Sequence, residues 1–189
     1  MGEGNERFRG LLEPVYAQAL AFARHISSSS TDGDDLFQEA LIRAIGKLDR
    51  LRDPAAFKPW LYRIVITVHR NRCRRAFWKR FVPLGTSAES GEPGPHVSGD
   101  YRSLEWSPDA AEAARRAREA LASLAPAYRE AIVLFEIEGW QVDELAKLLG
   151  VSPSAVKSRL ARGRAQLRAY YEARHQARSE ERRVGKECW

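Results

Sequence analysis

Residues 141–171 contain two helical patterns joined by a tight turn, and this feature constrains the fold of the chain more than any other. The first pattern repeats leucines at helical spacing, at Leu145, Leu148 and Leu149. Gly150 then stands where a helix end favours a left-handed residue. Ser152 and Pro153 are typical of an N-cap and a first helical position. The spacing predicts a helix-turn-helix, in which the second helix enters the major groove of DNA and the first supports it.

The second helix of this pair has an apolar side and a basic side. We expect it to bury Val156, Leu160 and Leu167. Residues 151–171 include no acidic residue, and their basic residues are Lys157, Arg159, Arg162, Arg164 and Arg168. The side opposite the apolar one holds the candidates for DNA contact, namely Ser154, Ala155, Ser158, Arg159 and Arg162. The alternative is an ordinary helical hairpin, although a solvated helix usually mixes both signs of charge.

Length, charge and cysteine content bound the class of protein. The 189 residues can form one large domain or two small ones. A net charge of +6 and an isoelectric point near 9.6 favour a polyanionic partner. Cys73 and Cys188 are far apart, so we expect no disulfide framework. The polar N-terminus lacks a signal-peptide pattern, and no apolar run reaches the ~20 residues of a bilayer span, so we expect a cytoplasmic protein.

Two apolar periods precede the first basic segment. One covers residues 6–25, and the other predicts a helix over residues 33–48 with Thr31 and Asp32 as its cap. The core face of the second helix comprises Leu36, Ala40, Ile45 and Leu48, widened by Phe37, Leu41 and Ala44. Its other side comprises Asp34, Asp35, Gln38, Glu39 and Arg43. These carboxylates could be paired catalysts, but a solvated face is the better interpretation because no nucleophile or histidine accompanies them.

A helix predicted over residues 59–81 begins apolar and aromatic and becomes strongly basic. No acidic residue lies between Pro54 and Ala88, and the basic residues there are Lys58, Arg63, Arg70, Arg72, Arg74, Arg75, Lys79 and Arg80. The aromatic residues among them are Phe57, Trp60, Tyr62, Phe77 and Trp78. Basic side chains bind phosphates, and aromatic rings stack on unpaired bases. The pattern favours nucleic-acid binding over a solvated helix face, although for each aromatic taken singly we expect burial in the core.

The composition changes after this helix. Residues 82–106 are rich in glycine, proline and serine without an apolar period, which is typical of a flexible linker. Ser107 and Pro108 then predict the start of a helix, and Pro126 predicts another that ends at Gly139. We therefore predict an all-α fold with two small helical domains, residues 6–81 and 107–173, joined by a flexible linker over residues 82–106. The second domain contains the helix-turn-helix.

Two stretches together resemble the sigma-70 family of bacterial RNA polymerase sigma factors. DDLFQEALIRAIGKLDRLRDPAAFKPWLYRIV, residues 34–65, resembles the second conserved region of that family. LASLAPAYREAIVLFEIEGWQVDELAKLLGVSPSAVKSRLARGRAQLR, residues 121–168, resembles the fourth. The length, and a short linker in place of an intervening domain, are similar to the extracytoplasmic-function group. The helix-turn-helix alone also resembles response-regulator output domains, whereas the DDLFQE and WLYRI motifs in this order do not.

The resemblance implies a sigma factor that binds core RNA polymerase and directs promoter recognition, DNA melting and transcription initiation. It implies polymerase contacts at Asp35, Leu36, Gln38, Glu39 and Arg43. It implies that the minus-ten element is bound and opened by Lys58, Trp60, Arg63, Arg70, Asn71 and Arg74. It implies that base edges of the minus-thirty-five element are read by Ser154, Ala155, Ser158, Arg159 and Arg162, with Lys157 and Arg164 at phosphates. An anti-sigma factor is a further implied partner.

Two features depart from the family pattern. Thr67 stands where many relatives carry asparagine, which bears on the detail of minus-ten recognition. The stretch RSEERRVGKEC, residues 178–188, resembles the translation of a common sequencing adapter. We therefore expect residues 178–189 to be an artefactual tail, and the alternative is a charged, disordered tail.

Two other functions fit parts of the sequence. A stand-alone helix-turn-helix regulator would bind DNA without polymerase, although the chain shows no dimerisation heptads and no ligand domain. An enzyme would need a constellation that the sequence lacks, since its histidines are scattered and it has neither a phosphate loop nor a G-x-S-x-G motif. We expect no catalytic residue, metal, cofactor, small-molecule substrate or membrane insertion.

Overall fold

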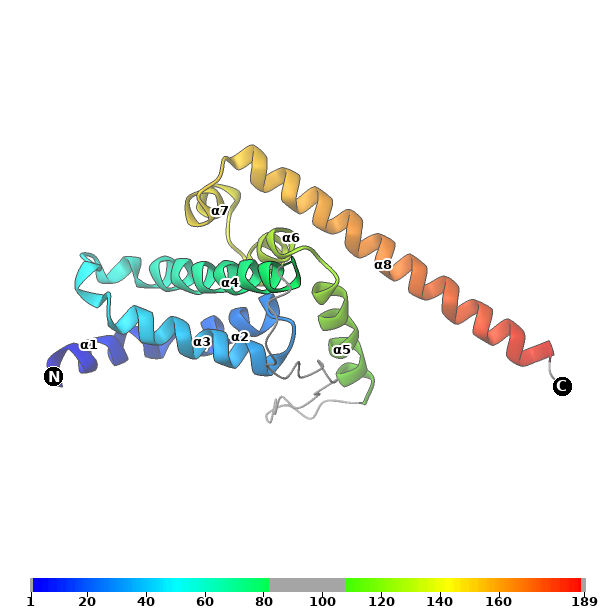
Figure 1. The fold of residues 1–189 in the computed structure, drawn as a ribbon, viewed down its shortest axis with the longest axis horizontal. Helices are drawn as coiled ribbons and strands as arrows, with labels where there is room; N and C mark the ends of the chain where they lie inside the picture. The colour runs from blue at the N-terminus through cyan, green and yellow to red at the C-terminus, as the bar shows by residue number, and fades with distance from the viewer. Residues whose placement is uncertain (1, 82–107, 188–189) are drawn as a thin grey trace. The chain divides into compact units, whose positions relative to one another are not determined.

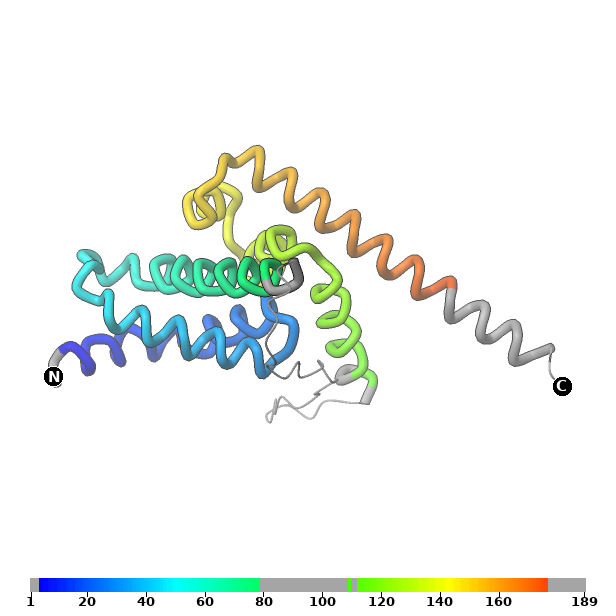
Figure 2. The backbone as a smooth tube through the Cα atoms, viewed as in Figure 1, coloured from blue at the N-terminus to red at the C-terminus, as the bar shows by residue number. Residues whose placement is uncertain are grey.

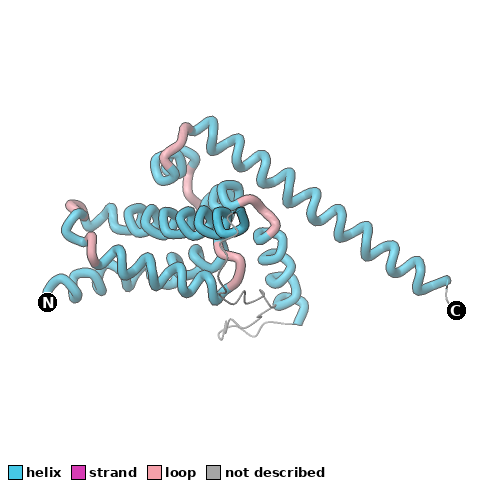
Figure 3. The backbone as a smooth tube through the Cα atoms, viewed as in Figure 1, coloured by secondary structure: helices cyan, strands magenta, loops and turns pink. Residues whose placement is uncertain are grey.

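The computed structural model describes residues 2–81 and 108–187, and it places side chains for residues 4–78, 109 and 112–176 (Figure 2). Within these ranges every regular element is a helix, as Figure 3 shows, which confirms the predicted all-α class. The described helices belong to two compact units that lie largely on either side of the predicted linker in sequence. That linker, residues 82–106, lies outside the described residues, so its prediction is not tested.

Four α-helices form the first unit (Figure 1), namely α1 (Gly2–Leu12), α2 (Tyr16–Ile26), α3 (Ser30–Ile45) and α4 (Phe57–Phe81). Pro14 lies in a 3-10 turn between α1 and α2, because proline lacks the N–H that a continuous helix needs. Between α3 and α4, Asp53 caps a second short turn, and its Oδ1 accepts a hydrogen bond from Ala55 N at 2.9 Å. Asp53 is therefore the N-cap of this turn. Helix α3 packs against both α2 and α4.

Helix α3 begins and ends earlier than the sequence pattern predicts. Its N-cap is Ser29, whose Oγ accepts a hydrogen bond from Asp32 N at 3.0 Å, so the predicted cap at Thr31 and Asp32 is wrong. The helix ends at Ile45, and the chain then enters a 3-10 turn at Leu48–Arg50. Leu48 is buried as predicted, but it belongs to this turn and not to α3. Ile45, the last residue of α3, is half exposed, so its predicted place in the core is wrong.

Aromatic rings hold the core of the first unit together. Phe22 of α2 stacks on Tyr62 of α4 with ring centroids 4.8 Å apart, and both are fully buried. Phe8 of α1 meets Phe57 of α4 edge to face at 5.8 Å. Aromatic pairs of this kind contribute about 0.5–1.5 kcal/mol beyond the burial of their area. They fix α4 against α1 and α2, so its remaining side keeps one defined set of exposed residues.

The second unit contains α5 (Pro108–Ala122), α6 (Pro126–Ile132), α8 (Pro153–Glu187) and most of α7 (Val142–Leu149). Helix α6 continues as a π-helical turn over Val133–Ile137, and Gly139 then adopts a φ of 73°. The predicted helix from Pro126 to Gly139 is thus confirmed, with a changed hydrogen-bond register in its last turns. Arg129 Nη2 donates to the carbonyl oxygens of Ala122 at 2.6 Å and Leu124 at 3.1 Å, and so ties α6 to the end of α5.

The turn before α8 follows the predicted chemistry. Gly150 has a φ of 67°, in the left-handed region that favours glycine. Ser152 Oγ accepts a hydrogen bond from Ala155 N at 3.2 Å, and Pro153 is the first residue of α8. Val156 and Leu160 are buried as expected, and Leu167 is half-buried. Helix α8 packs against α6 and α5. Its backbone is helical through Glu187, and the artefactual origin of residues 178–189 stays a prediction.

Candidate nucleic-acid interface

One face of α4 carries a continuous row of exposed or half-buried side chains. Its members recur at intervals of three and four residues, and we call them the α4 stripe: Trp60, Arg63, Thr67, Arg70, Asn71, Arg74, Phe77 and Trp78. The rest of α4 supplies the buried residues Leu61, Tyr62, Val65, Ile66, Val68 and His69. The helix therefore has one apolar face in the core and one basic, aromatic face outside it.

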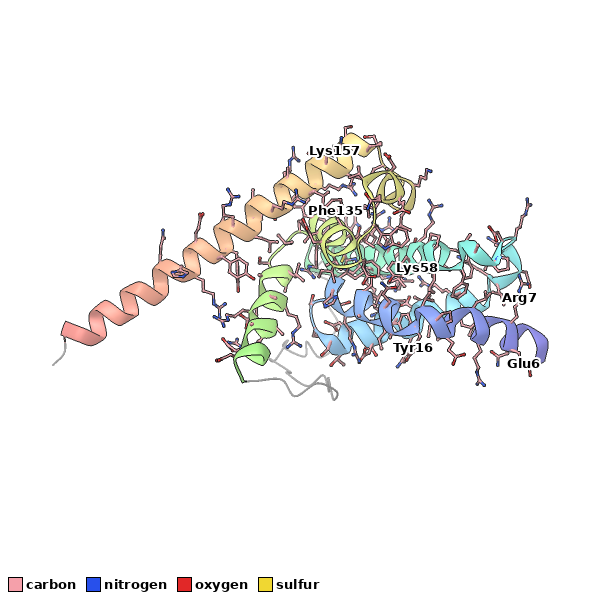
Figure 4. All side chains as sticks on the ribbon, turned by 180° about the vertical axis from the view of Figure 1, so that it is seen from behind. Glu6, Arg7, Tyr16, Lys58, Phe135 and Lys157 are labelled. Carbon is pink, nitrogen blue, oxygen red and sulfur yellow. The ribbon has the colours of Figure 1, made fainter. Side chains whose placement is uncertain are left out.

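The stripe includes all the predicted minus-ten residues except Lys58. Lys58 (labelled in Figure 4) instead lies toward α2, where its Nζ donates to Gln18 Oε1 at 2.9 Å and lies 5.7 Å from the centroid of the Tyr62 ring. The structure thus groups Trp60, Arg63, Arg70, Asn71 and Arg74, and separates Lys58 from them.

Contacts within the stripe orient its polar groups. Arg74 Nη2 donates to Asn71 Oδ1 at 2.7 Å. Thr67 Oγ1 donates to the carbonyl oxygen of Arg63 at 2.7 Å, so the residue that departs from the family pattern presents a hydroxyl already bonded to its own helix. Trp60 rests on the buried ring of Phe57, with centroids 5.7 Å apart, which leaves part of its indole accessible.

Phe77 and Trp78 extend the stripe beyond the predicted set. Burial in the core was the expectation for each aromatic of α4 taken singly, and it is right for Phe57 and Tyr62. It is wrong for Phe77 and Trp78, which are 56% and 59% exposed. Their exposure follows from their place near the C-terminal end of α4. Phe77 and Trp78 follow Arg74 by three and four residues, which places both rings on the same helix face as the arginines. This spacing could have identified them from the sequence.

Arg72 is a basic residue of α4 whose side chain bonds to α3. Its Nε donates to Glu39 Oε2 at 2.8 Å, and its Nη2 donates to the carbonyl oxygen of Asp35 at 2.9 Å. Glu39 Oε1 also accepts from Arg43 Nη2 at 2.5 Å. This Glu39 network, made of Glu39, Arg43 and Arg72, connects α3 to α4. Glu39 and Arg43, which are two of the predicted polymerase contacts, thus form bonds inside the first unit.

The exposed face of α3 differs from the predicted polymerase-binding set. Asp35 and Gln38 are exposed as expected, whereas Leu36 is only 1% exposed, which confirms its predicted place in the core and leaves its side chain outside the exposed face. In its place the structure exposes Ile42, at 72%, and Ile45. Gln38, Ile42 and Ile45 share a face at intervals of four and three residues. The predicted core face included Ile45 because the end of α3 was placed one turn too late.

The N-terminal half of α8 separates its basic residues into different environments. Ser154, Ser158 and Arg162 recur at intervals of four and are exposed, and Lys157 is exposed on the first turn (Figure 4). Ala155 and Arg159 are half-buried, and Arg159 Nη1 is a buried atom without a hydrogen-bond partner among the described residues. The outermost candidates for base contact are therefore Ser154, Ser158 and Arg162.

Arg164 is held by the π-helical turn before Gly139. Its Nε and Nη2 both donate to Glu136 Oε1, at 2.9 and 2.6 Å, and its guanidinium lies 5.6 Å from the centroid of the Phe135 ring. Such a pair on the surface is worth about 0–1 kcal/mol, so a phosphate could replace the carboxylate. Of the predicted phosphate contacts, Lys157 is directly available, and Arg164 first has to leave Glu136.

One cysteine with a described side chain lies next to a histidine. Cys73 Sγ lies 3.5 Å from Nε2 of the buried His69, one turn earlier on α4. In the described parts of the chain no three His, Cys, Asp or Glu side chains gather closely enough to hold a metal ion. None of the helices described is both long enough and apolar enough to cross a bilayer.

Comparison with known families matches both units. A Sigma-70 region 2 model matches residues 11–79, and a Sigma-70, region 4 model matches residues 114–167. A protein of Xanthomonas campestris named "Probable RNA polymerase sigma factor RfaY" is 36% identical over 82% of this chain, which spans 36% of that protein. The ECF RNA polymerase sigma factor SigM of Mycobacterium tuberculosis is 31% identical over 85% of this chain and 74% of its own length. A solved structure of the sigma factor RpoE in complex with the anti-sigma factor NepR from Bartonella quintana has a TM-score of 0.64 and 27% identity, covering 87% of this chain and 96% of that one.

Proposed function

The chain belongs to the sigma-70 family of bacterial RNA polymerase sigma factors, in its extracytoplasmic-function (ECF) group, and from this membership we propose how its surfaces divide the work of promoter recognition. The exposed face of α3 binds core RNA polymerase. The α4 stripe binds and opens the minus-ten element, and the N-terminal half of α8 reads the minus-thirty-five element. The chain contributes specificity, and the polymerase carries out RNA synthesis. The domains that do this are residues 6–81 and 107–173, with residues 82–106 as their linker.

The observation that carries the proposal is the composition of the α4 stripe. Arg63, Arg70 and Arg74 supply positive charge along one helix face, and no residue of α4 is acidic. Their affinity for phosphates is not sequence-specific and falls with salt. Trp60, beside them, offers a partly open ring on which an unpaired base can stack, worth about 1–3 kcal/mol. Unstacking one base costs a few kcal/mol, so stacking together with phosphate contacts offsets the cost of opening.

The α3 face suits a protein partner. Ile42 and Ile45 form an exposed apolar pair next to the polar side chains of Asp35 and Gln38. Interfaces commonly have an apolar centre with a polar rim, and a few central side chains carry most of their binding energy. We assign this centre to Ile42 and Ile45. An anti-sigma factor that covered the same pair would keep the chain from polymerase.

The α8 surface suits duplex DNA. Ser154, Ser158 and Arg162 lie on successive turns near the start of the helix, which is the end that a helix-turn-helix inserts into the major groove. An arginine there can contact two acceptors of guanine at once, and serine can contact several bases. Lys157 lies on the flank of this row and is placed for a phosphate.

Reconstitution with core RNA polymerase tests the function. The chain should form a complex with core enzyme and direct a run-off transcript from at least one promoter of its own genome. Replacing both Ile42 and Ile45 with glutamate should weaken the complex by at least about tenfold, since it places charge at an apolar interface. Ile137→Glu is a matched control, because Ile137 is comparably exposed in the second unit.

The result separates a sigma factor from a stand-alone regulator. A regulator would bind its promoter as tightly without core enzyme as with it, and the glutamate pair would leave binding unchanged. A wild-type chain that neither binds core enzyme nor directs a transcript would refute the proposal.

A further inference from the structure

Phe77 and Trp78 are two large aromatic side chains that lie outside the buried core of the first unit. Their rings meet edge to face with centroids 6.2 Å apart, and both are more than half exposed. Large aromatic side chains are rarely this exposed in a folded domain unless the surface binds something. The minus-ten contacts predicted by family resemblance end at Arg74, so no role falls to this pair.

We propose that Phe77 and Trp78 form a second stacking platform for unpaired bases, at the opposite end of the α4 stripe from Trp60. The proposal rests on the proposed function, because it takes the unpaired strand of an opened promoter as the ligand. Each base has an aromatic face, so a ring platform binds a strand with little dependence on its sequence.

The charge around the pair selects a nucleic acid over an apolar protein segment. Arg74 lies one turn before Phe77 and Trp78 on the same face, and Arg70 lies one turn before Arg74. Arg75 is exposed on the flank. Since α4 contains no acidic residue, the helix itself presents only favourable charge to a strand of phosphates.

The length of the stripe sets where the second platform meets the strand. Trp60 and Trp78 are 18 residues apart, which is about 27 Å along a helix at ~1.5 Å per residue. An unpaired strand that kept the ~3.4 Å rise per nucleotide of duplex DNA would place about eight nucleotides along this distance, and a more extended strand would place fewer. A strand that followed the stripe would therefore reach Phe77 and Trp78 near the far boundary of a short promoter element.

Binding to a forked promoter tests the platform. The wild-type holoenzyme and a Phe77→Ala, Trp78→Ala double variant are compared on DNA whose minus-ten strand is unpaired. We expect the double variant to lose about tenfold or more in affinity, whereas Trp78→Phe keeps most of it because a ring remains. The slope of log affinity against log salt concentration should stay unchanged in the double variant. In Arg74→Ala it should fall by the equivalent of about one phosphate contact. Tyr171→Ala, which removes an exposed ring from the second unit, is the control and should bind as wild type.

An abasic scan identifies the stacked base. Single bases are removed in turn from the unpaired strand. Wild-type holoenzyme should lose affinity at one or two positions where the double variant loses none. Identical profiles, or equal affinities on the intact fork, would overturn the platform. A variant that loses affinity for core polymerase but not for the fork would show a protein contact instead, and would also overturn it.

The two proposals can fail separately. If the wild-type chain does not bind core enzyme, the proposed function is wrong, and the platform is then tested with single-stranded oligonucleotides alone. Equal oligonucleotide binding by the wild-type chain and the double variant would refute the platform in that case. If the holoenzyme forms and transcribes normally with the double variant, only the platform is wrong.

Discussion

Gly163 of α8 lies directly against Ile132 of α6. A Cβ atom added at Gly163 would stand 2.8 Å from Ile132 Cγ1 and 3.5 Å from Tyr128 Cβ, and Ile132 is buried. Real Cβ atoms do not approach a neighbour this closely, so the two helices can be this near only because residue 163 has no side chain. This contact helps to set the position of α8 on the rest of the second unit.

Gly163→Ala should therefore destabilise the second unit. Alanine favours a helix over glycine by about 1 kcal/mol, but overpacking of a tight site costs about 1–3 kcal/mol. Ile132 is β-branched and has few other rotamers, so the cost should exceed the gain. Urea unfolding of the full chain measures the change. Gly10→Ala is the control, because nothing lies within 4 Å of a Cβ atom there, and it should be neutral or stabilising. A Gly163→Ala chain as stable as wild type would show that α6 and α8 separate at no cost.

The sequence predicts those parts of the fold whose signals are local. The turn at Gly150, the cap at Ser152 and the helix from Pro126 each depend on residues within one turn, and each is confirmed. The role of Gly163 could not be predicted, because a glycine inside a helical pattern gives no sign of what packs against it. The cap of α3 was misplaced because four consecutive serines and a threonine, residues 27–31, are all acceptable N-cap residues.

The surfaces were predictable to different degrees. The basic and aromatic residues of α4 could be found from composition alone, whereas the choice of most members of the α4 stripe came from the family resemblance. Arg72 could not be distinguished from its basic neighbours, because its partner Glu39 is 33 residues away in sequence. Ile42 was left out of the α3 surface because an apolar residue in an amphipathic helix is normally assigned to the core.

Gly150 should tolerate asparagine better than alanine. With φ at 67°, a residue with a Cβ atom is strained by about 1–2 kcal/mol, and asparagine adopts this region more readily than alanine does. Nothing lies within 4 Å of a Cβ atom at this position, so the cost comes from the backbone alone. We expect the melting temperature to fall in the order wild type, Gly150→Asn, Gly150→Ala. Equal melting temperatures for the two variants would show that the φ value is not what constrains residue 150.

Glu39 and Arg72 should be energetically coupled. Their side chains are about one-third exposed, and the ion pair is joined by a bond from Arg72 to the Asp35 carbonyl. A double-mutant cycle with Glu39→Gln and Arg72→Gln should give a coupling of about 1 kcal/mol, decreasing with salt. Arg43→Gln is the comparison, since its pair with Glu39 within one helix should contribute only about 0.3–0.5 kcal/mol. Additive effects of the Glu39 and Arg72 changes would mean that the network does not hold α3 to α4.

Glu112 should make the stability of the folded chain depend on pH in the acidic range. The hydrogen bonds from Arg115 are the main reason that the pKa of Glu112 is lowered from its ordinary value of 4.5. A carboxyl with a lowered pKa in the folded chain contributes stability that is present above 4.5 and is lost as pH falls through the folded pKa. Unfolding measured across this acidic range should therefore show a smaller loss of stability in Glu112→Gln than in wild type. A loss of equal size in both chains would assign the acid sensitivity to other carboxyls.

Arg162 and Arg164 should differ in what they contribute to promoter binding, although they are two residues apart. Arg162 is exposed in the row with Ser154 and Ser158, whereas Arg164 is bonded to Glu136. If Arg162 contacts a guanine, Arg162→Ala should cost about 1–3 kcal/mol on the preferred minus-thirty-five element and much less on an element with that base pair changed. Arg164→Ala should have a small effect that is the same on both elements.

Glu136→Gln completes this test, because it weakens the hold on Arg164 without removing the arginine. We expect Glu136→Gln to raise affinity for all elements equally and to steepen the salt dependence by up to about one phosphate, since Arg164 becomes free to bind DNA. Equal losses from Arg162→Ala on both elements would instead make Arg162 a phosphate contact. Holoenzyme binding to the two elements over a range of salt concentrations distinguishes these results, since base contacts change the ratio of affinities and phosphate contacts change the slope.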